Sequence, residues 1–132
     1  MATWDDVSRL ALALPDVVQL TDTNGFKWEV GHKYFAWERP LRKADLVDLV
    51  DAAPNGPILG VRVAELHDKK GLIGSDPAVF FTISHLEDYP AVLILLHKSS
   101  LEQLGEVLTD AWLCRAPKRL STAFLEAHPA IT

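Results

Sequence analysis

Apolar residues recur at helical spacing at both ends of this chain and alternate with polar residues in between. The first such run ends at Pro15, and Thr3 and Asp6 at its start have the spacing of a capping box. This pattern predicts a helix at about residues 4–14. The apolar positions that define this helical face are Trp4, Val7, Leu10, Ala11 and Leu14.

The next segments follow the two-residue period of half-buried strands. Residues 17–22 predict a short strand, and Thr23-Asn-Gly25 is a strong turn signal. Apolar and charged residues then alternate over residues 26–30, and an aromatic segment follows at residues 34–37. We therefore expect these last two segments to form an antiparallel hairpin.

The segment from Leu41 to Ala53 is ambiguous, and a short helix is the prediction. Its apolar face would hold Leu46, Leu49, Val50 and Ala53. Carboxylates recur every three residues on the other side, where solvation would explain them. These carboxylates are Asp45, Asp48 and Asp51.

The second half of the chain predicts strands at residues 58–63 and 91–96 and a short helix at 65–74. Asp76-Pro77 predicts a helix or turn start that leads into residues 79–81. The last strand is apolar on both faces, so we expect it inside a sheet. A long helix begins after Ser99 or Ser100, and Pro117 either bends it or begins another helix through Leu125. Together the elements predict a single α+β domain whose mainly antiparallel sheet packs against N- and C-terminal helices.

Composition narrows the class of protein. The 132 residues carry a formal net charge of −5 and one cysteine, Cys114, which excludes an internal disulfide. No run approaches the roughly 18 apolar residues of a membrane span, and Asp5 and Asp6 give the N-terminus the wrong charge for a signal peptide. We therefore expect a soluble, cytoplasmic protein. An acidic chain binds nucleic acid only through a local basic patch.

Several segments, in their order and spacing, resemble the MmcQ/YjbR-like family over most of the chain. They are Thr3-Trp-Asp-Asp6-Val7, Pro57-Ile-Leu-Gly-Val-Arg62-Val, Asp76-Pro-Ala-Val-Phe-Phe81, His85 with Asp88-Tyr-Pro-Ala-Val-Leu93, Thr109-Asp-Ala-Trp112 and Ala116-Pro-Lys-Arg-Leu120. The resemblance implies one bacterial domain over residues 1–132 with a CyaY-like, double-wing fold. It also implies a DNA-binding-like role and neither an enzymatic activity nor a cofactor.

Basic residues supply the candidate DNA contacts. One group crowds the predicted hairpin and the residues after it, interleaved with aromatic side chains, and a second group follows Pro117. The candidate contacts are Lys27, Lys33, Arg39, Arg42, Lys43, Lys118 and Arg119. For the hairpin, the alternative is a half-buried strand pair with aromatics inward and lysines in water. For Lys118 and Arg119, the alternative is a helix C-terminus, which favours cations.

The remaining polar residues predict neither a metal site nor a catalytic one. No histidine pair has ligand spacing, and Cys114 at a helix C-terminus should have a raised pKa and behave as an ordinary, at least half-buried thiol. Glu102, Glu106 and Asp110 should form an exposed acidic face that points away from any DNA. Three functions remain: a non-catalytic module that contacts double-stranded DNA, a module that binds a protein or small ligand in an aromatic groove beside the sheet, or an enzyme, which no motif supports.

Overall fold

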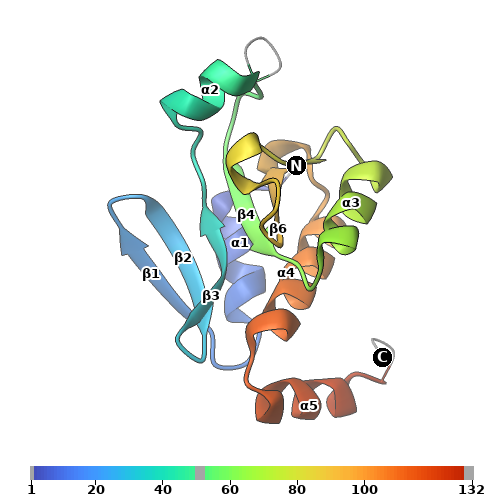
Figure 1. Ribbon diagram of the computed structural model, residues 1–132. Coiled ribbons are helices and arrows are strands. Elements are labelled where there is room, and N and C mark those ends of the chain that lie inside the picture. Colours follow the sequence, from blue (N-terminus) through green and yellow to red (C-terminus); the bar gives the residue numbers. More distant parts are fainter. Residues whose placement is uncertain (1, 50–52, 130–132) are drawn as a thin grey trace.

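The first half of the chain forms a helix and a three-stranded meander. The computed structural model describes residues 2–49 and 53–129, and Figure 1 shows them in sequence colours. Helix α1 spans Trp4–Leu12, and strands β1, β2 and β3 span Val18–Asp22, Gly25–Val30 and Lys33–Glu38. Gly31 and His32 both have positive φ, as a two-residue hairpin turn between β2 and β3 requires. The predicted hairpin is therefore confirmed.

The second half supplies the centre of the sheet and the remaining helices. The elements are α2 (Lys43–Leu49), β4 (Ile58–Arg62), α3 (Leu66–Ser75), β5 (Phe80–Phe81), the 3-10 turn η2 (Ser84–Leu86), β6 (Ala91–Leu95), the 3-10 turn η3 (Leu96–Lys98), α4 (Leu101–Arg115) and α5 (Lys118–Ala127). Of the two alternatives at Pro117, the structure has a separate helix, because Pro117 is the N-cap of α5. No helix within residues 2–49 and 53–129 has the length and apolarity that a bilayer span needs.

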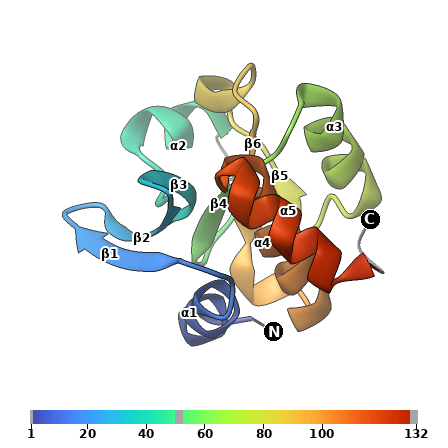
Figure 2. The same cartoon turned by 90° about the horizontal axis from the view of Figure 1, so that it is seen from below.

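The six strands form one antiparallel sheet in the order β1-β2-β3-β4-β6-β5. Helices α1 and α4 lie behind the sheet in Figure 1, and Figure 2 shows α5 beyond the end of α4. The α+β class and the packing of the sheet against terminal helices are therefore as predicted. The Ser100–Gln103 capping box fixes the start of α4.

The two faces of the sheet are covered differently. On the helix side, Trp28 from β2, Phe35 from β3 and Trp112 from α4 are fully buried in the main core. Trp4 and Phe81 are only partly buried. On the outer side, a smaller core forms under α2 and η2. Its buried residues are Ile58, Ile83, Leu93 and Leu95. Strands β4 and β6 are thus buried on both faces, whereas none of the described helices forms such a cover over the outer face of β1–β3.

Helix α2 contradicts the predicted assignment of its faces. Asp45 is buried, with 4% exposure, whereas Leu46 and Val47 are exposed. The reason is local: the Asp45 carboxylate accepts a hydrogen bond from the Arg42 amide (2.9 Å) at the start of the helix. Val50 and Asp51, also assigned to this helix, lie outside the described residues.

Candidate functional site

A pocket of about 460 Å³ lies on the outer face of the sheet, where the cover formed by α2 and η2 ends. We call it the outer-face pocket. Strands β2 and β3 supply its floor, and the segment around η2 supplies one wall. Its lining residues are Asp22, Asn24, Phe26, Lys27, Tyr34, Trp37, Glu38, Arg39, Pro40, Arg42, His85, Leu86 and Tyr89.

Arg39 is the most unusual residue of this pocket because its guanidinium is almost completely buried. Its side chain is 7% exposed, and its Nη1 lies 3.1 Å from the Asp45 carboxylate, which is equally buried. Burial raises the pKa of Asp45, but the Arg42 amide and the Arg39 charge outweigh it and hold that pKa below its ordinary value. The other terminal nitrogen, Nη2, is buried and has no hydrogen-bond partner among the described residues.

Aromatic rings form the body of the pocket. Tyr34 and Trp37 meet edge to face, with ring centroids 5.4 Å apart. The Trp37 indole rests on Gly60, where an added Cβ would approach the ring to 2.7 Å. Tyr34 and Tyr89 are 40% and 38% exposed, so both present surface to a ligand. The aromatic groove expected beside the sheet is therefore present in the structure.

The acidic groups of the pocket already have partners. Lys27 Nζ lies 2.8 Å from the Asp22 carboxylate, and this contact raises the pKa of Lys27 and lowers that of Asp22. The Glu38 carboxylate accepts a hydrogen bond from the Phe26 amide (3.2 Å). Arg42, in contrast, is exposed at the rim.

A buried lysine fixes the wall of the pocket. Lys69, on α3, is 3% exposed, and its Nζ donates to the carbonyl oxygens of Leu86, Glu87 and Tyr89. Desolvation lowers the pKa of this lysine. The segment that carries His85 and Tyr89 is thereby attached to α3.

The structure divides the seven predicted DNA contacts into three groups. Lys27, Arg39 and Arg42 line the outer-face pocket, and Lys43 begins α2 on an exposed surface. The other three lie at the opposite end of the sheet. An added Cβ at Gly31 would come within 2.9 Å of Pro117, so the β2–β3 turn lies against the start of α5. Lys33, Lys118 and Arg119 flank this contact.

Lys118 and Arg119 occupy a different helical position from the one expected. They form the first turn of α5 and not the last turn of the long helix, which ends at Arg115. The helix dipole therefore disfavours their charges and does not explain them. Sequence reasoning also missed Asp45, His85 and Tyr89 as parts of the pocket environment.

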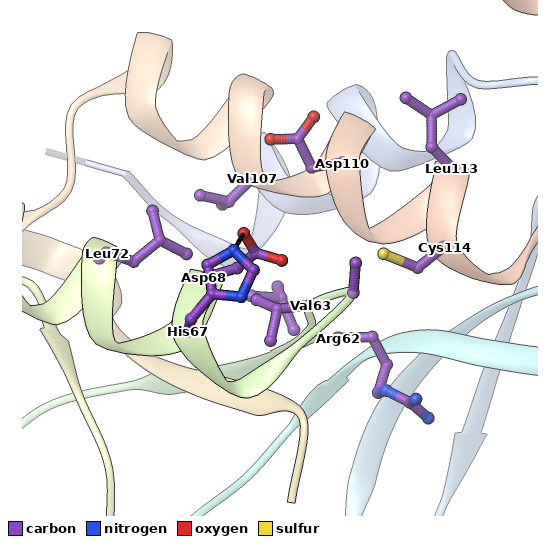
Figure 3. A pocket seen from close by; sticks show the side chains of 12 residues that line it. Arg62, Val63, His67, Asp68, Leu72, Val107, Asp110, Leu113 and Cys114 are labelled. Atoms are coloured by element: carbon purple, nitrogen blue, oxygen red, sulfur yellow. Dashed lines mark ion pairs between the residues drawn. The ribbon is translucent and has the colours of Figure 1, made fainter.

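A second pocket, of about 690 Å³, separates α3 from α4 and is shown in Figure 3. We call it the helix cleft. Its apolar wall contains Val63, Leu72, Val107 and Leu113, and its polar groups include Asp68 and Asp110. Desolvation, followed by the nearby charges of Glu106 and Asp68, raises the pKa of Asp110.

Cys114 lies at the end of the helix cleft and is more exposed than expected. Desolvation nevertheless raises the pKa of its thiol, which is the predicted direction. On α3 and just before it, Glu65, His67 and Asp68 place one potential ligand atom each within 4.8 Å of one another. All three side chains are exposed, and His67 forms ion pairs with both carboxylates when protonated.

Comparison with known proteins relates the chain to proteins without an assigned function. No family model matches the sequence. The uncharacterised proteins Rv2570 of Mycobacterium tuberculosis (strain H37Rv) and Mb2600 of Mycobacterium bovis are 46% identical over 128 residues, which covers 95% of this chain and 97% of each relative.

A solved structure shows the same fold. The crystal structure of Deinococcus radiodurans protein DR2400, a DUF419 domain, matches with a TM-score of 0.66 at 20% identity. The match covers 96% of this chain and 88% of that one. DUF419 is the MmcQ/YjbR domain, so the fold agrees with the resemblance read from the sequence.

Proposed function

Because the chain belongs to the same family as the mycobacterial protein Rv2570, for which no function is stated, we propose a function from its own outer-face pocket. The protein is a non-catalytic module that binds a small ligand composed of an anionic group and a flat ring. The observation that carries this proposal is the buried, unpartnered Nη2 of Arg39 in an aromatic pocket. Membership of the MmcQ/YjbR-like family is part of the same proposal, supported by the shared fold.

The arginine favours an anion. A buried donor without a partner costs about 1–3 kcal/mol, and more when the group is charged, so nearly all such donors in proteins are satisfied. The planar guanidinium offers a geometry that matches the oxygens of a carboxylate or a phosphate. Since Nη1 of Arg39 is already used by Asp45, a ligand would complete the hydrogen bonding at Nη2. Arg42 adds an exposed positive charge at the rim.

The rings favour a flat, unsaturated ligand body. Tyr34, Trp37 and Tyr89 present ring surfaces, and ring–ring contacts contribute about 0.5–1.5 kcal/mol beyond the burial of area. Pockets that bind small molecules typically combine such apolar walls with a few convergent polar groups. The outer-face pocket has both features within one cavity.

Isothermal titration calorimetry with phenyl phosphate, inorganic phosphate and phenol tests the proposal. We expect phenyl phosphate to bind most tightly, because it alone offers both the anion and the ring. Arg42→Ala should weaken binding, whereas Lys43→Ala, which removes the neighbouring exposed cation outside the pocket, should not. If phenyl phosphate binds no better than phenol, or if both variants lose the same affinity, the assignment of this pocket fails.

DNA binding is a second candidate, and the contact between Gly31 and Pro117 favours it. This contact places Lys33 beside Lys118 and Arg119 at one end of the molecule, although the chain is acidic overall. Anisotropy of a labelled duplex at two salt concentrations tests it, with Lys33→Glu/Lys118→Glu as the variant. Binding that weakens steeply with salt and is lost in the variant supports this candidate. No binding at tens of micromolar protein in low salt excludes it.

A further inference from the structure

The helix cleft has the form of a ligand site that is independent of the outer-face pocket. Its apolar wall comes from two layers, with Val63 after the end of β4 and Leu72, Val107 and Leu113 on the flanking helices. Figure 3 shows these side chains around an open space, with Asp110 on α4 and Asp68 on α3 at its margins. The volume of about 690 Å³ lies within the range of small-molecule pockets.

The cleft continues past a glycine in the middle of α3. Gly71 lines the cleft, and an added Cβ would meet no described atom within 4 Å, so the space beside it is open. Neither packing nor backbone conformation requires a glycine here, since its φ is not positive. A larger side chain at this position would occupy part of the cleft.

The cleft has an unpaired negative charge at Asp110. This exposed carboxylate makes no hydrogen bond or ion pair with any residue that the structure describes. Asp68, in contrast, accepts a hydrogen bond from the Glu65 amide (3.1 Å) and lies 3.3 Å from Nε2 of His67. Arg62 is the one permanent cation in the lining, but its Nε donates to the Pro90 carbonyl (3.1 Å) and its Nη1 to the Tyr89 hydroxyl (3.3 Å). In Figure 3 its guanidinium points away from Asp110.

We propose that the helix cleft binds an amphipathic amine. The ammonium group lies at the Asp110 carboxylate, and the hydrocarbon body covers Val63, Leu72 and Val107. A cation is favoured because it neutralises this unpaired carboxylate and donates charge-assisted hydrogen bonds to it. A carboxylate ligand would meet like charge at the same position. An apolar body is favoured because it removes the exposed apolar wall from water.

Chemical-shift mapping of the ¹⁵N-labelled protein with hexylammonium, hexan-1-ol and hexanoate tests the proposal. The three probes share one hydrocarbon chain and differ only in the charge of the head group. We expect hexylammonium to shift amides of α3 and α4 around the cleft and to bind at least about fivefold more tightly than hexan-1-ol. Equal affinities for the three probes, or shifts confined to the outer-face pocket, would overturn the proposal.

Variants separate the roles of charge and volume. Asp110→Asn should weaken hexylammonium about fivefold and leave hexan-1-ol unchanged, whereas Gly71→Leu should weaken both by filling the cleft. Glu102→Gln, which removes a carboxylate of α4 outside the cleft, is the control for charge, and Gly71→Ala is the control for helix stability. Unchanged hexylammonium affinity in a folded Asp110→Asn protein contradicts the proposal, as does an equal loss in Glu102→Gln. Circular dichroism verifies the fold of each variant, and a Gly71→Leu protein that does not fold leaves Asp110→Asn as the deciding test.

Discussion

Removal of the Asp45 carboxylate should destabilise the protein severely. Asp45→Ala takes away the ion-pair partner of a guanidinium that is 7% exposed and also the acceptor for the Arg42 amide. Breaking a buried ion pair from one side costs about 3–5 kcal/mol, because the other charge remains buried without compensation. Among the described residues, the Pro40 carbonyl would remain the acceptor for Nη1 of Arg39, but it is uncharged and does not replace the carboxylate.

The expected loss is large relative to the stability of a chain of this size. At about 0.05–0.15 kcal/mol per residue, 132 residues give a free energy of unfolding of roughly 7–20 kcal/mol. The entropy of unfolding is about 0.28 kcal/mol/K for this length, so Tm should fall by roughly 11–18 °C. With a urea slope of about 2 kcal/mol/M, the midpoint should fall by roughly 1.5–2.5 M.

Urea unfolding followed by tryptophan fluorescence measures the loss, since Trp28 and Trp112 are fully buried. Asp48→Ala is the matched control on the same helix, because its carboxylate is exposed and accepts only from the Ser84 hydroxyl. The double variant Arg39→Met/Asp45→Leu should recover most of the stability, since no orphaned charge remains. A loss below about 1 kcal/mol in Asp45→Ala, or a double variant no more stable than the single one, would refute the reasoning.

The same substitution connects stability to the proposed ligand. Without Asp45, the buried arginine has no counter-charge among the described residues, and an anion in the outer-face pocket would supply one. Phosphate should therefore raise the Tm of Asp45→Ala more than that of the unmodified protein, by linkage between binding and folding. An equal rise of Tm in both proteins would show that phosphate does not bind at Arg39.

Three further perturbations have definite expected outcomes. Lys69→Met should remove the ammonium donor from the carbonyl oxygens of Leu86, Glu87 and Tyr89, of which Leu86 and Tyr89 keep a backbone amide donor. Hydrogen exchange in residues 84–90, measured by mass spectrometry, should therefore increase; unchanged exchange would show that the lysine does not hold this segment. Gly60→Ala should displace the Trp37 ring, lower the free energy of unfolding by about 1–3 kcal/mol and weaken the binding of phenyl phosphate. An unchanged affinity for phenyl phosphate would show that the ligand binds elsewhere. Because the pKa of Asp110 is raised in the folded protein, its ionised form lowers the free energy of unfolding at pH values above its ordinary pKa of 3.8. Asp110→Asn should therefore raise Tm at pH 7, and this gain should vanish as the pH falls below 3.8. A constant gain at all pH values would exclude ionisation as the cause.

Local patterns in the sequence were sufficient for most of the secondary structure. The β2–β3 hairpin follows from alternation over residues 26–30 and from the turn at Gly31, and both signals act over a few residues. The burial of β6 on both faces follows from its uninterrupted apolar run. The boundary between α4 and α5 was left open, because Pro117 is compatible with either a bend or a new helix.

The candidate sites could be predicted only in part, because they depend on contacts between distant segments. Asp45 was predicted to face solvent, because charged residues are rarely buried without a partner. Its partner, Arg39, precedes the helix, so the pattern within the helix does not reveal the pair. The cover over this pair includes η2, about 40 residues later in the chain, which no local pattern connects to α2. Similarly, the helix cleft joins residues of α3 to residues of α4, and its existence depends on how the two helices pack.

The position of β6 has a consequence for how the chain assembles during synthesis. Although β6 is the last strand in the sequence, it lies between β4 and β5, so the sheet is incomplete until residue 95 has been made. The main core closes later still, since the Trp112 indole donates to the carbonyl of Pro15, 97 residues earlier. Contacts of such long separation form slowly. The β1–β3 meander is therefore synthesised before α4 can cover its Trp28 face, and the apolar surface exposed in that interval favours aggregation.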